Sequence, residues 1–191
     1  MPDTPTAEEV RPLLRGRFGH PYEFVASCPS TQRLLAPDAP EGSVAVADEQ
    51  TEGRGRLGRR WEAPKGASLL CSVQLRPDVD PQRYPELTVL GAGATAAAIR
   101  SLTGLAPDLK EPNDLLIGAR KVAGILGEAN EGRVVLGIGI NVNLRAGELP
   151  EDTQLPATSL LIETGEAVDR RRLLAELLRE LEQRYDDWLT A

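Results

Sequence analysis

The sequence of 191 residues contains one histidine and two cysteines, the side chains that usually bind transition metals in proteins. Cys28 and Cys71 are far apart in the chain and have no ligand-like neighbours. This scarcity argues against a transition-metal site. We expect both cysteines to be reduced thiols packed in the interior of a cytoplasmic protein.

Long apolar runs are also absent. No stretch approaches about 18 consecutive apolar residues, the length that a membrane-spanning helix needs. The N-terminal residues show no basic segment followed by an apolar one, so we expect no signal peptide. These absences predict a soluble, cytoplasmic protein that does not associate with membranes.

Aromatic residues make up only 4% of the chain, so the core has to be built from Leu, Val, Ile and Ala. A chain of this length typically buries about 70% of its unfolded surface and needs no disulfide or metal to fold. The formal net charge of −7 is unfavourable for general binding to the phosphate backbone of nucleic acids. A local basic loop can still bind one small anionic ligand.

Hydrophobic periodicity and turn residues predict one α+β domain over residues 1–191, a mixed, largely antiparallel sheet backed by helices. Helices are expected over residues 4–17, 29–32 and 85–102 and from Asp169 onward, and strands over residues 22–26, 43–48, 68–75, 114–117, 121–129 and 133–142. The last three strands should form antiparallel hairpins, because short turns at 118–120 and 130–132 separate them. Strand 68–75 alternates as a half-buried strand does, and either Ser30 or Thr31 is placed to cap the short helix. A polar, proline-bearing loop is expected over residues 145–156.

The first motif is Gln-Thr-Glu-Gly-Arg-Gly-Arg-Leu-Gly-Arg-Arg-Trp at residues 50–61. Its three glycines let the backbone wrap closely around a ligand, and the guanidinium groups of Arg54 and Arg56 suit carboxylate and phosphate. A solvated basic loop is one alternative. A loop for single-stranded nucleic acid is another, although the net charge and the lack of nearby aromatic residues speak against it. No Gly-Lys-Ser/Thr follows, so this is not a P-loop.

The second motif is Lys-Glu-Pro-Asn-Asp at residues 110–114, followed by Arg-Lys-Val-Ala-Gly-Ile-Leu at residues 120–126. Lys121 lies at the start of a predicted strand, just after a tight turn. On its own, this position is better explained by a solvent-exposed lysine at the edge of a hairpin. Asn113 and Asp114 can likewise be plain turn formers.

The third motif is Val-Val-Leu-Gly-Ile-Gly-Ile-Asn-Val-Asn at residues 134–143. With a period of two, its large apolar side chains face the core, and Gly137, Gly139 and Asn141 lie on the opposite face. Two glycines weaken a strand and often mark a place where a ligand approaches the backbone. The alternative is that they accommodate the packing of a nearby helix.

The order and spacing of these segments resemble the biotin–protein ligase family. Catalytic domains of that family carry Gly-Arg-Gly-Arg-x-Gly-Arg, Lys-Trp-Pro-Asn-Asp, Lys-x-x-Gly-Ile-Leu and Gly-x-Gly-Ile-Asn-Val in this order. Ser30 and Thr31 lie upstream where the family has its Ser-Thr pair, and residues 157–160, Ala-Thr-Ser-Leu, also look like the family. The resemblance covers residues 25–185 and implies the fold of a biotin/lipoate ligase catalytic domain.

The resemblance implies an ATP-dependent biotin–[biotin carboxyl carrier protein] ligase. In that family the biotin carboxylate attacks the α-phosphate of ATP, pyrophosphate leaves, and the acyl-adenylate passes biotin to a lysine of a carrier protein. The implied partner is the biotin carboxyl carrier domain of acetyl-CoA carboxylase or of a related carboxylase. No covalent enzyme nucleophile is needed, which agrees with a sequence that lacks a convincing Ser–His or Cys–His pair. Catalysis would consist of positioning and charge stabilisation.

Site residues are carried over by position. Those implied for biotin are Ser30, Thr31, Gln32, Gln50, Gly53, Arg54, Gly55, Arg56, Lys121 and Gly124. Those implied for ATP are Arg56, Trp61, Lys110, Asn113, Asp114, Lys121 and Asn141. Lys121, Arg56 and Arg54 would be catalytic, with Lys121 bridging the carboxylate and the α-phosphate. Asp114 would contact a Mg²⁺ ion held mainly by phosphate oxygens and water, and Trp61 would lie near the adenine unless it is a core tryptophan.

The sequence departs from the family pattern in two ways. Glu111 stands where the family has a tryptophan that walls the biotin pocket, and a carboxylate there would repel the ligand carboxylate unless it is paired or points elsewhere. The family's small C-terminal β-barrel domain is expected to be absent. An N-terminal helix-turn-helix domain is expected to be absent as well, so we predict no DNA binding.

Three other functions stay open. A lipoate or octanoate ligase or transferase shares the fold but lacks the Gly/Arg motif in this form. A non-catalytic biotin- or adenylate-binding protein would bind ligand without releasing pyrophosphate, and a nucleic-acid-binding module would lose affinity steeply with salt. By analogy with some family members, an exposed edge of the Gly-rich strand can pair across a homodimer. We also expect residues 54–60 to be disordered without ligand and ordered on binding.

Overall fold

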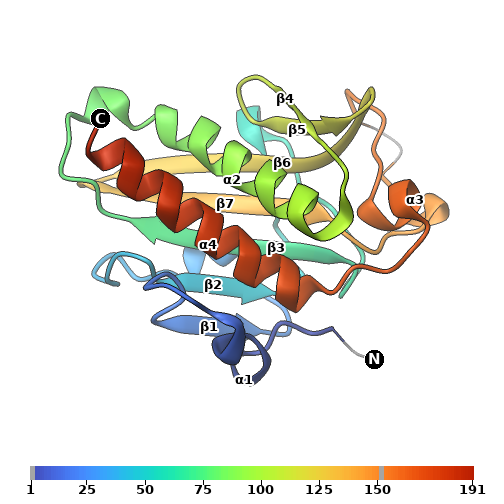
Figure 1. Ribbon diagram of the computed structural model, residues 1–191, viewed down its shortest axis with the longest axis horizontal. Helices are drawn as coiled ribbons and strands as arrows, with labels where there is room; N and C mark the ends of the chain where they lie inside the picture. The colour runs from blue at the N-terminus through green and yellow to red at the C-terminus, as the bar shows by residue number, and fades with distance from the viewer. Residues whose placement is uncertain (1–2, 151–152) are drawn as a thin grey trace.

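A computed structural model describes residues 3–150 and 153–191, which form a seven-stranded sheet with two long helices packed on one face (Figure 1). The strands are β1 Tyr22–Val25, β2 Val44–Ala47, β3 Ser68–Leu75, β4 Asp108–Lys110, β5 Asp114–Ile117, β6 Arg120–Asn130 and β7 Arg133–Asn141. Their order across the sheet is β1-β2-β3-β7-β6-β5-β4. The pair β1–β2 is parallel and every other neighbouring pair is antiparallel. The predicted mixed, largely antiparallel sheet backed by helices is confirmed.

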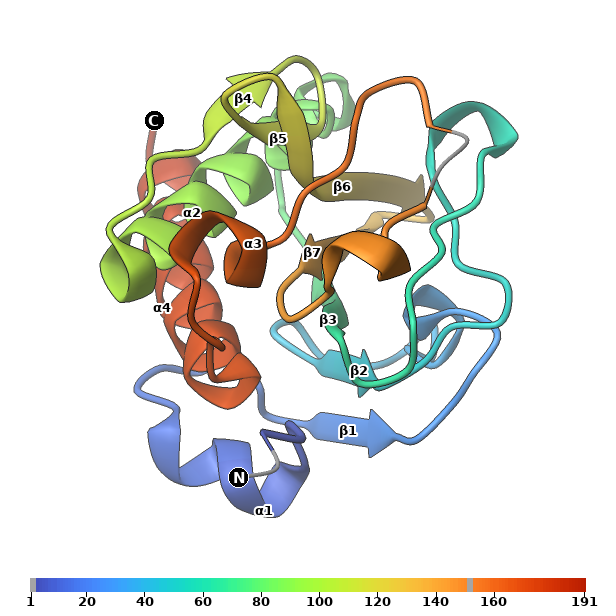
Figure 2. The ribbon, with the colours of Figure 1, turned by 90° about the vertical axis from the view of Figure 1, so that its right-hand side faces the viewer.

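The two long helices are α2 Glu86–Thr103 and α4 Arg170–Leu189. Gly104 ends α2 with a φ of 75°, the left-handed conformation that glycine adopts without strain. Asp169 caps α4, because its side chain accepts hydrogen bonds from the backbone N–H groups of Arg171 and Arg172. Figure 2 shows both helices on one side of the sheet and the segment between β2 and β3 on the other. We call this segment, residues 48–67, the Gly/Arg loop.

The core between the sheet and the helices is built from Leu, Val, Ile and Ala, as the scarcity of aromatic residues predicts. One face of β7 contributes Val134, Leu136, Ile138 and Ile140 to this core, in the predicted alternation. Every residue of β3 is buried, so the prediction of a half-buried strand is wrong. The reason is that β3 is covered on both faces, by helices on one side and by loop segments on the other (Figure 2).

The N-terminal helix is shorter than predicted. The helix expected over residues 4–17 is the single turn α1 Ala7–Val10, followed by a 3₁₀ turn at Arg11–Leu13. Pro12 explains the difference, because proline lacks the N–H that would continue the α-helical ladder. The helix expected over residues 29–32 is a 3₁₀ turn at Thr31–Arg33, and Ser30 at its N-cap position makes no capping hydrogen bond through its side chain.

Two other features were not predicted. Strand β4 is only three residues long, too short to carry a recognisable alternation, and pairs with β5. The Gly-rich strand β7 lies between β3 and β6 and is hydrogen-bonded on both edges. It therefore offers no free edge, and the predicted pairing of that edge across a dimer is wrong.

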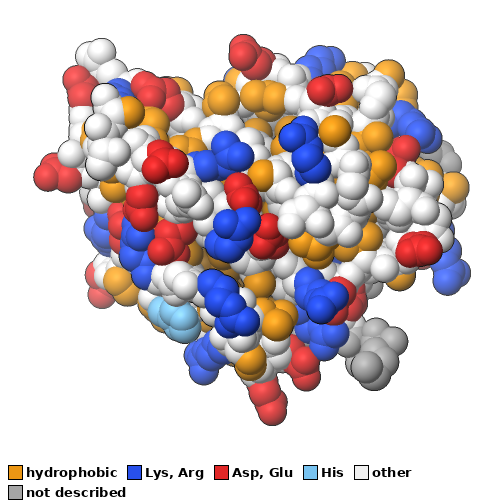
Figure 3. All heavy atoms as spheres, viewed as in Figure 1, with side chains coloured by type: hydrophobic (Ala, Val, Ile, Leu, Met, Phe, Trp, Pro, Cys, Tyr) orange, Lys and Arg blue, Asp and Glu red, His pale blue; other side chains and the backbone are white. Residues whose placement is uncertain are grey.

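Short segments complete the described chain. The loop expected over residues 145–156 contains a 3₁₀ turn at Ala146–Glu148, and its residues 151–152 lie outside the described part. Helix α3 Leu160–Thr164 follows it, and further 3₁₀ turns lie at Arg56–Gly58 and Pro81–Arg83. Over residues 3–150 and 153–191, no helix combines the length and the apolar character that crossing a bilayer would need. Basic and acidic side chains are interspersed over the face formed by α2 and α4 (Figure 3).

Candidate functional site

A cleft with a cavity volume of about 110 Å³ lies on the sheet face opposite the long helices, where the Gly/Arg loop crosses β6 and β7. Most of the residues predicted for the site line it: Ser30, Thr31, Gln32, Gln50, Arg54, Gly55, Arg56, Trp61, Asn113, Asp114, Lys121 and Gly124. Three separate stretches of sequence thus meet at one place.

The floor of the cleft is backbone. Gly124 of β6 and Gly139 of β7 are direct partners across the sheet, and the ring of Trp61 lies against them. A Cβ atom added at Gly139 would come within 2.7 Å of this ring, and one at Gly124 within 3.0 Å. A Cβ at Gly137 would come within 3.1 Å of the Gln32 side chain. The glycines of β7 therefore make room for cleft residues, and the alternative that they accommodate a nearby helix is wrong.

One end of the cleft is polar and well ordered by hydrogen bonds. Gln50 Oε1 accepts from the backbone N–H of Thr31 at 2.8 Å and from its hydroxyl at 3.1 Å. The Thr31 hydroxyl also lies 2.7 Å from the hydroxyl of Ser72 on β3. Gln32 donates to the carbonyl of Leu126 at 3.3 Å. This end presents hydroxyl and amide groups, which suit a neutral polar ligand head.

Charged groups also line the cleft. Lys121 Nζ lies 2.7 Å from Asp114 Oδ1, and it lies 5.5 Å from the centre of the Trp61 ring. Arg56 donates to Asn113 Oδ1 at 3.3 Å, and Arg54 forms an ion pair with Glu128 at 2.8 Å. Three cations of the predicted site therefore lie around one cleft, where they can meet an anionic ligand.

The backbone of Lys121 is hydrogen-bonded to the segment that follows residue 155. Its N–H donates to the carbonyl of Pro156 at 2.7 Å, and its carbonyl accepts from Thr158 at 2.8 Å. Its side chain is 26% exposed. The alternative of a hairpin-edge lysine in water is therefore wrong, because the segment after residue 153 covers that edge.

The Gly/Arg loop folds back on itself. Arg54 and Arg60 form a β-bridge, and the N–H of Trp61 donates to the carbonyl of Gly53 at 3.0 Å. A Cβ at Gly53 would lie 2.3 Å from the carbonyl oxygen of Trp61, so this close approach requires glycine. Gly53 shapes the loop without lining the cleft. The predicted disorder of residues 54–60 without ligand stays a prediction.

Two other predicted residues and Glu111 lie outside the cleft. Lys110 is exposed at the end of β4. Asn141 is buried, donates to the carbonyl of Thr158 at 2.9 Å, and borders an adjoining hollow with Trp61 and Lys121. Glu111 is exposed and does not line the cleft, so it points elsewhere, as one of the two outcomes considered for it.

Several residues that line the cleft or contact its lining residues were not predicted. The hydroxyl of Ser72 on β3 hydrogen-bonds to that of Thr31. Ser72 alternates with the core residues of β3, and this pattern could have placed it on the face opposite the core. Arg59 and Arg60 belong to the Gly/Arg motif already singled out. Residues 153–155 also line the cleft, and Gln154 accepts a hydrogen bond from Arg59 at 2.5 Å. They lie in an irregular loop without a recognisable pattern, so no sequence signal pointed to them.

The cysteines fit the expectation of packed thiols. Both are unpaired in disulfides and buried. Burial raises the pKa of Cys71 to about 12 and raises that of Cys28. A thiol with a raised pKa is a poor nucleophile at neutral pH. Neither thiol is therefore suited to act as a nucleophile.

The donor set suits a metal ion only as a companion of a phosphorylated ligand. Among residues 3–150 and 153–191 no cluster of three His, Cys, Asp or Glu side chains can bind a metal. Asp114 Oδ1 is buried, and the charge that faces it is the Lys121 ammonium. One carboxylate beside a cleft fits Mg²⁺, which takes most of its ligands from phosphates and water.

Comparison with known proteins gives a consistent result. The model of the biotin/lipoate A/B protein ligase family matches residues 24–144. The bifunctional ligase/repressor BirA of Bacillus subtilis (strain 168) is 41% identical over 175 residues, covering 88% of this chain and 54% of that protein. The biotin–[acetyl-CoA-carboxylase] ligase of Mycobacterium tuberculosis is 41% identical over 155 residues, covering 79% of this chain and 57% of the relative. The chain thus spans about half the length of the curated relatives it matches.

Solved structures agree with the fold. A structure of biotin protein ligase from Aquifex aeolicus in complex with biotin and ATP superposes with a TM-score of 0.77 at 35% identity, covering 86% of this chain and 70% of that one. A Leishmania major biotin protein ligase in complex with biotinyl-5-AMP gives a TM-score of 0.75 at 24% identity, covering 88% and 76%. At that lower identity the second likeness concerns the fold alone.

Proposed function

Because the chain belongs to the biotin/lipoate A/B protein ligase family, we propose that it is an ATP-dependent biotin–protein ligase. It would join biotin to AMP and pass the biotinyl group to a lysine of a biotin carboxyl carrier domain, in acetyl-CoA carboxylase or a related carboxylase. The observation that carries the proposal is Lys121, which lines the same cleft as Thr31, Gln32 and Gln50 and whose ammonium lies 5.5 Å from the centre of the Trp61 ring. Relatives whose names state this activity, and a solved relative with biotin and ATP bound, support it.

In the first step a carboxylate oxygen of biotin forms a bond to the α-phosphorus of ATP, and the bond from that phosphorus to the pyrophosphate oxygen breaks. Both reactants are anions, so their approach is opposed by charge repulsion. Lys121, with Arg54 and Arg56, would lower this barrier by facing both anions with fixed positive charge. Asp114 would keep the Lys121 ammonium in place before the ligands arrive.

The ligands would be oriented by the two ends of the cleft. The polar head of biotin would bind at Ser30, Thr31, Gln32 and Gln50, where hydroxyl and amide groups already share hydrogen bonds. The nucleotide would lie at Trp61, Asn113 and Asp114, toward the hollow bordered by Asn141. Trp61 Nε1 is buried and makes no hydrogen bond in the described chain, so a bound ligand can satisfy it. Mg²⁺ would supply further charge neutralisation at the phosphates, held by them and by Asp114.

In the second step the ε-amine of the carrier lysine forms a bond to the carbonyl carbon of biotinyl-AMP, AMP leaves with the electrons of the broken bond, and the amine loses a proton. The mixed anhydride is reactive, so the step needs little beyond alignment of the amine. We propose a cytoplasmic location for this reaction, where the carboxylase partner would be found.

Pyrophosphate release tests the proposal. ATP and Mg²⁺ are supplied with biotin, with lipoate or with neither acid, and the rate is measured for each. We expect release that depends on biotin. Release with lipoate alone would assign the chain to the other branch of the family, and biotin binding in calorimetry without any release would identify a non-catalytic binder.

A further inference from the structure

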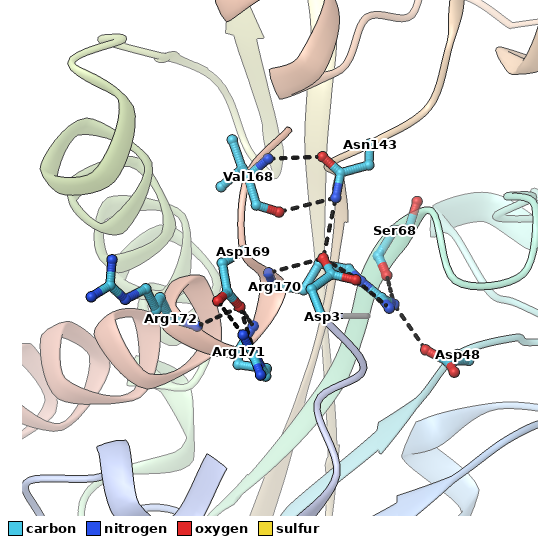
Figure 4. Close-up of polar contacts among 9 residues, drawn as sticks. All are labelled: Asp3, Asp48, Ser68, Asn143, Val168, Asp169, Arg170, Arg171 and Arg172. Atoms are coloured by element: carbon cyan, nitrogen blue, oxygen red, sulfur yellow. Dashed lines mark hydrogen bonds and ion pairs between the residues drawn. The ribbon is translucent and has the colours of Figure 1, made fainter. Parts of the chain in front are cut away.

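A buried arginine lies far along the chain from the Gly/Arg loop and yet contacts both ends of it. Arg170, the first residue of α4, is 2% exposed. One of its terminal nitrogens, Nη1, donates to Asp48 Oδ1 at 2.8 Å and to the carbonyl of Ser68 at 3.2 Å. Asp48 follows β2 directly, and Ser68 is the first residue of β3. The same guanidinium nitrogen therefore joins the two strands from which the loop departs (Figure 4).

The opposite side of the guanidinium is held by Asp3. Asp3 Oδ2 accepts from Arg170 Nε at 3.1 Å, and Asp3 Oδ1 accepts from Nη2 at 3.0 Å, a two-point contact that fixes the plane of the group. We call Asp3, Asp48, Ser68 and Arg170 the Arg170 cluster. Figure 4 shows Arg170 between the two carboxylates, with Asp3 on the side toward Asn143 and Asp48 on the side toward the loop.

The loop has further supports near its two ends. At its start, the N–H of Asp48 donates to the carbonyl of Val25 at 3.3 Å, and the carbonyl of Glu49 accepts from the N–H of Cys28 at 3.1 Å. Gly66 donates to the carbonyl of Asp48 at 2.9 Å, and Asn143 donates to the carbonyl of Ala67 at 2.7 Å. Asn143 in turn donates from its side chain to Asp3 at 3.2 Å. The supports at the end of the loop are thus connected to the Arg170 cluster through Asp48 and Asn143. Between these ends lie Gln50, Arg54, Arg56 and Trp61, which all line the cleft.

We propose that Arg170 is a positioning residue that, through Asp48, holds the base of the Gly/Arg loop so that its ligand-binding side chains face the cleft. This inference rests on the proposed function for the identity of the ligands. The residue touches no ligand itself, since it lies behind the loop at the start of α4. The two carboxylates of Asp3 and Asp48 offset the desolvation of its buried guanidinium. Its side chain contacts the N-terminal segment, the residue after β2 and the first residue of β3.

The chain offers a matched pair of variants. Asp48→Asn and Asp3→Asn each leave Arg170 with one carboxylate, so each removes one of the two ion pairs of the same buried arginine. Asp48 belongs to the loop and Asp3 does not. If Arg170 only stabilises the fold, both variants should change ligand binding and loop cleavage equally. If Arg170 positions the loop, Asp48→Asn should change them much more than Asp3→Asn.

The first readout is the KM for biotin in pyrophosphate release. If the aligned loop is populated about one-tenth of the time in Asp48→Asn, the KM rises about tenfold with kcat nearly unchanged. Asp3→Asn should raise the KM less than about twofold at a similar loss of Tm. Equal changes in the two variants, or no change in either, would overturn the proposal.

The second readout needs no activity. Trypsin cleaves after Arg54, Arg56, Arg59 and Arg60, and mass spectrometry identifies these cuts. Asp48→Asn should speed cleavage at these sites well above the rate in Asp3→Asn, while the rest of the chain stays intact. Arg170→Lys keeps the charge but not the planar fork; it should show the same selective cleavage and serves if Asp48→Asn folds poorly. If the wild type releases no pyrophosphate, the proposed function fails, and the trypsin comparison still decides whether Arg170 positions the loop.

Discussion

Lys121 connects the electrostatics of the cleft to the proposed chemistry. Lys121→Ala removes the cation that faces both reacting anions, and losing one such preorganised group typically lowers kcat by about 10²–10³. We expect a loss of that size in biotin-dependent pyrophosphate release. Lys65→Ala, at an exposed lysine of the Gly/Arg loop, is the control and should keep the wild-type rate.

A second variant tests whether the loss of rate comes from lost stability alone. Lys121→Ala leaves the buried Asp114 carboxylate without its cation, which destabilises the fold. The double variant with Asp114→Asn removes that unpaired charge. Its Tm should recover while its rate stays low. Recovery of both would mean that Lys121 acts on the fold alone.

Gly139 tests the position of Trp61. In Gly139→Ala the new methyl group would lie 2.7 Å from the indole ring, so the ring has to move. If Trp61 binds the nucleotide, the KM for ATP should rise about tenfold, the cost of losing roughly 1.4 kcal/mol of binding. Gly147→Ala, where a Cβ meets nothing within 4 Å, should leave the KM unchanged. An unchanged KM in Gly139→Ala would remove Trp61 from the nucleotide site.

The sequence located much of the cleft because three of its segments carry compact motifs with glycines at positions of close approach. Gly137 and Gly139 in the third motif predicted a close approach of a ligand to the backbone, and the first motif contains Gln50 and Arg56, which line the cleft. The motifs could not predict contacts from residues that are far away in the sequence. Arg170 lies 122 residues from Asp48, and Gln154 reaches Arg59 from an irregular loop. Such partners meet only through the tertiary fold, so no local pattern predicts them.

At the scale of the elements, the C-cap of α2 gives a clean stability test. Gly104 has a φ of 75°, and a Cβ added there would meet nothing within 4 Å. Gly104→Ala therefore costs only the backbone strain of a left-handed alanine, about 1–2 kcal/mol. Urea unfolding should show this loss with an unchanged m-value. Pyrophosphate release at 25 °C should match the wild type, since the cap is on the helical side of the sheet.

The elements that the sequence predicted well are those with long patterns and clear ends. Helix α4 has its apolar stripe, and Asp169 caps it where the pattern begins. Strands β5, β6 and β7 were read as a meander because Gly118 and Gly132 mark their turns. The prediction of a longer N-terminal helix was wrong because Pro12, which lacks a backbone N–H, cannot continue the α-helical ladder. Strand β4 failed because three residues show no alternation, and its pairing partner β5 decides its conformation.

At the scale of the whole molecule, ion pairs on the helical side predict how stability depends on pH. Arg171 lowers the pKa of Asp169, Arg179 lowers that of Glu176, and Arg17 lowers that of Asp186. A carboxyl group with a lowered pKa in the folded chain stabilises it fully above the ordinary value. This stabilisation is lost as the pH falls through the lower, folded value. We expect the Tm to be flat near neutral pH and to fall below about pH 4.

Asp169→Asn isolates one of these contributions. Asparagine is as good an N-cap as aspartate, so α4 keeps its first hydrogen bonds. The charge that pairs with Arg171 is gone. The variant should therefore have a slightly lower Tm at pH 7 and a shallower fall toward pH 2, measured by circular dichroism. A fall as steep as in the wild type would mean that Asp169 titrates normally.

The glycine floor of the cleft has a consequence for how this protein can diverge. The ladder between β6 and β7 fixes the depth of the cleft, and a substitution at Gly124 or Gly139 runs into Trp61 rather than reshaping the ligand contact. Adaptive change toward a longer or bulkier acid is therefore channelled into the loops that form the walls, at residues 50–61 and 153–155. A selection for new substrates should enrich substitutions in these loops and leave the strand glycines unchanged. The sheet would then be conserved while the loops diverge.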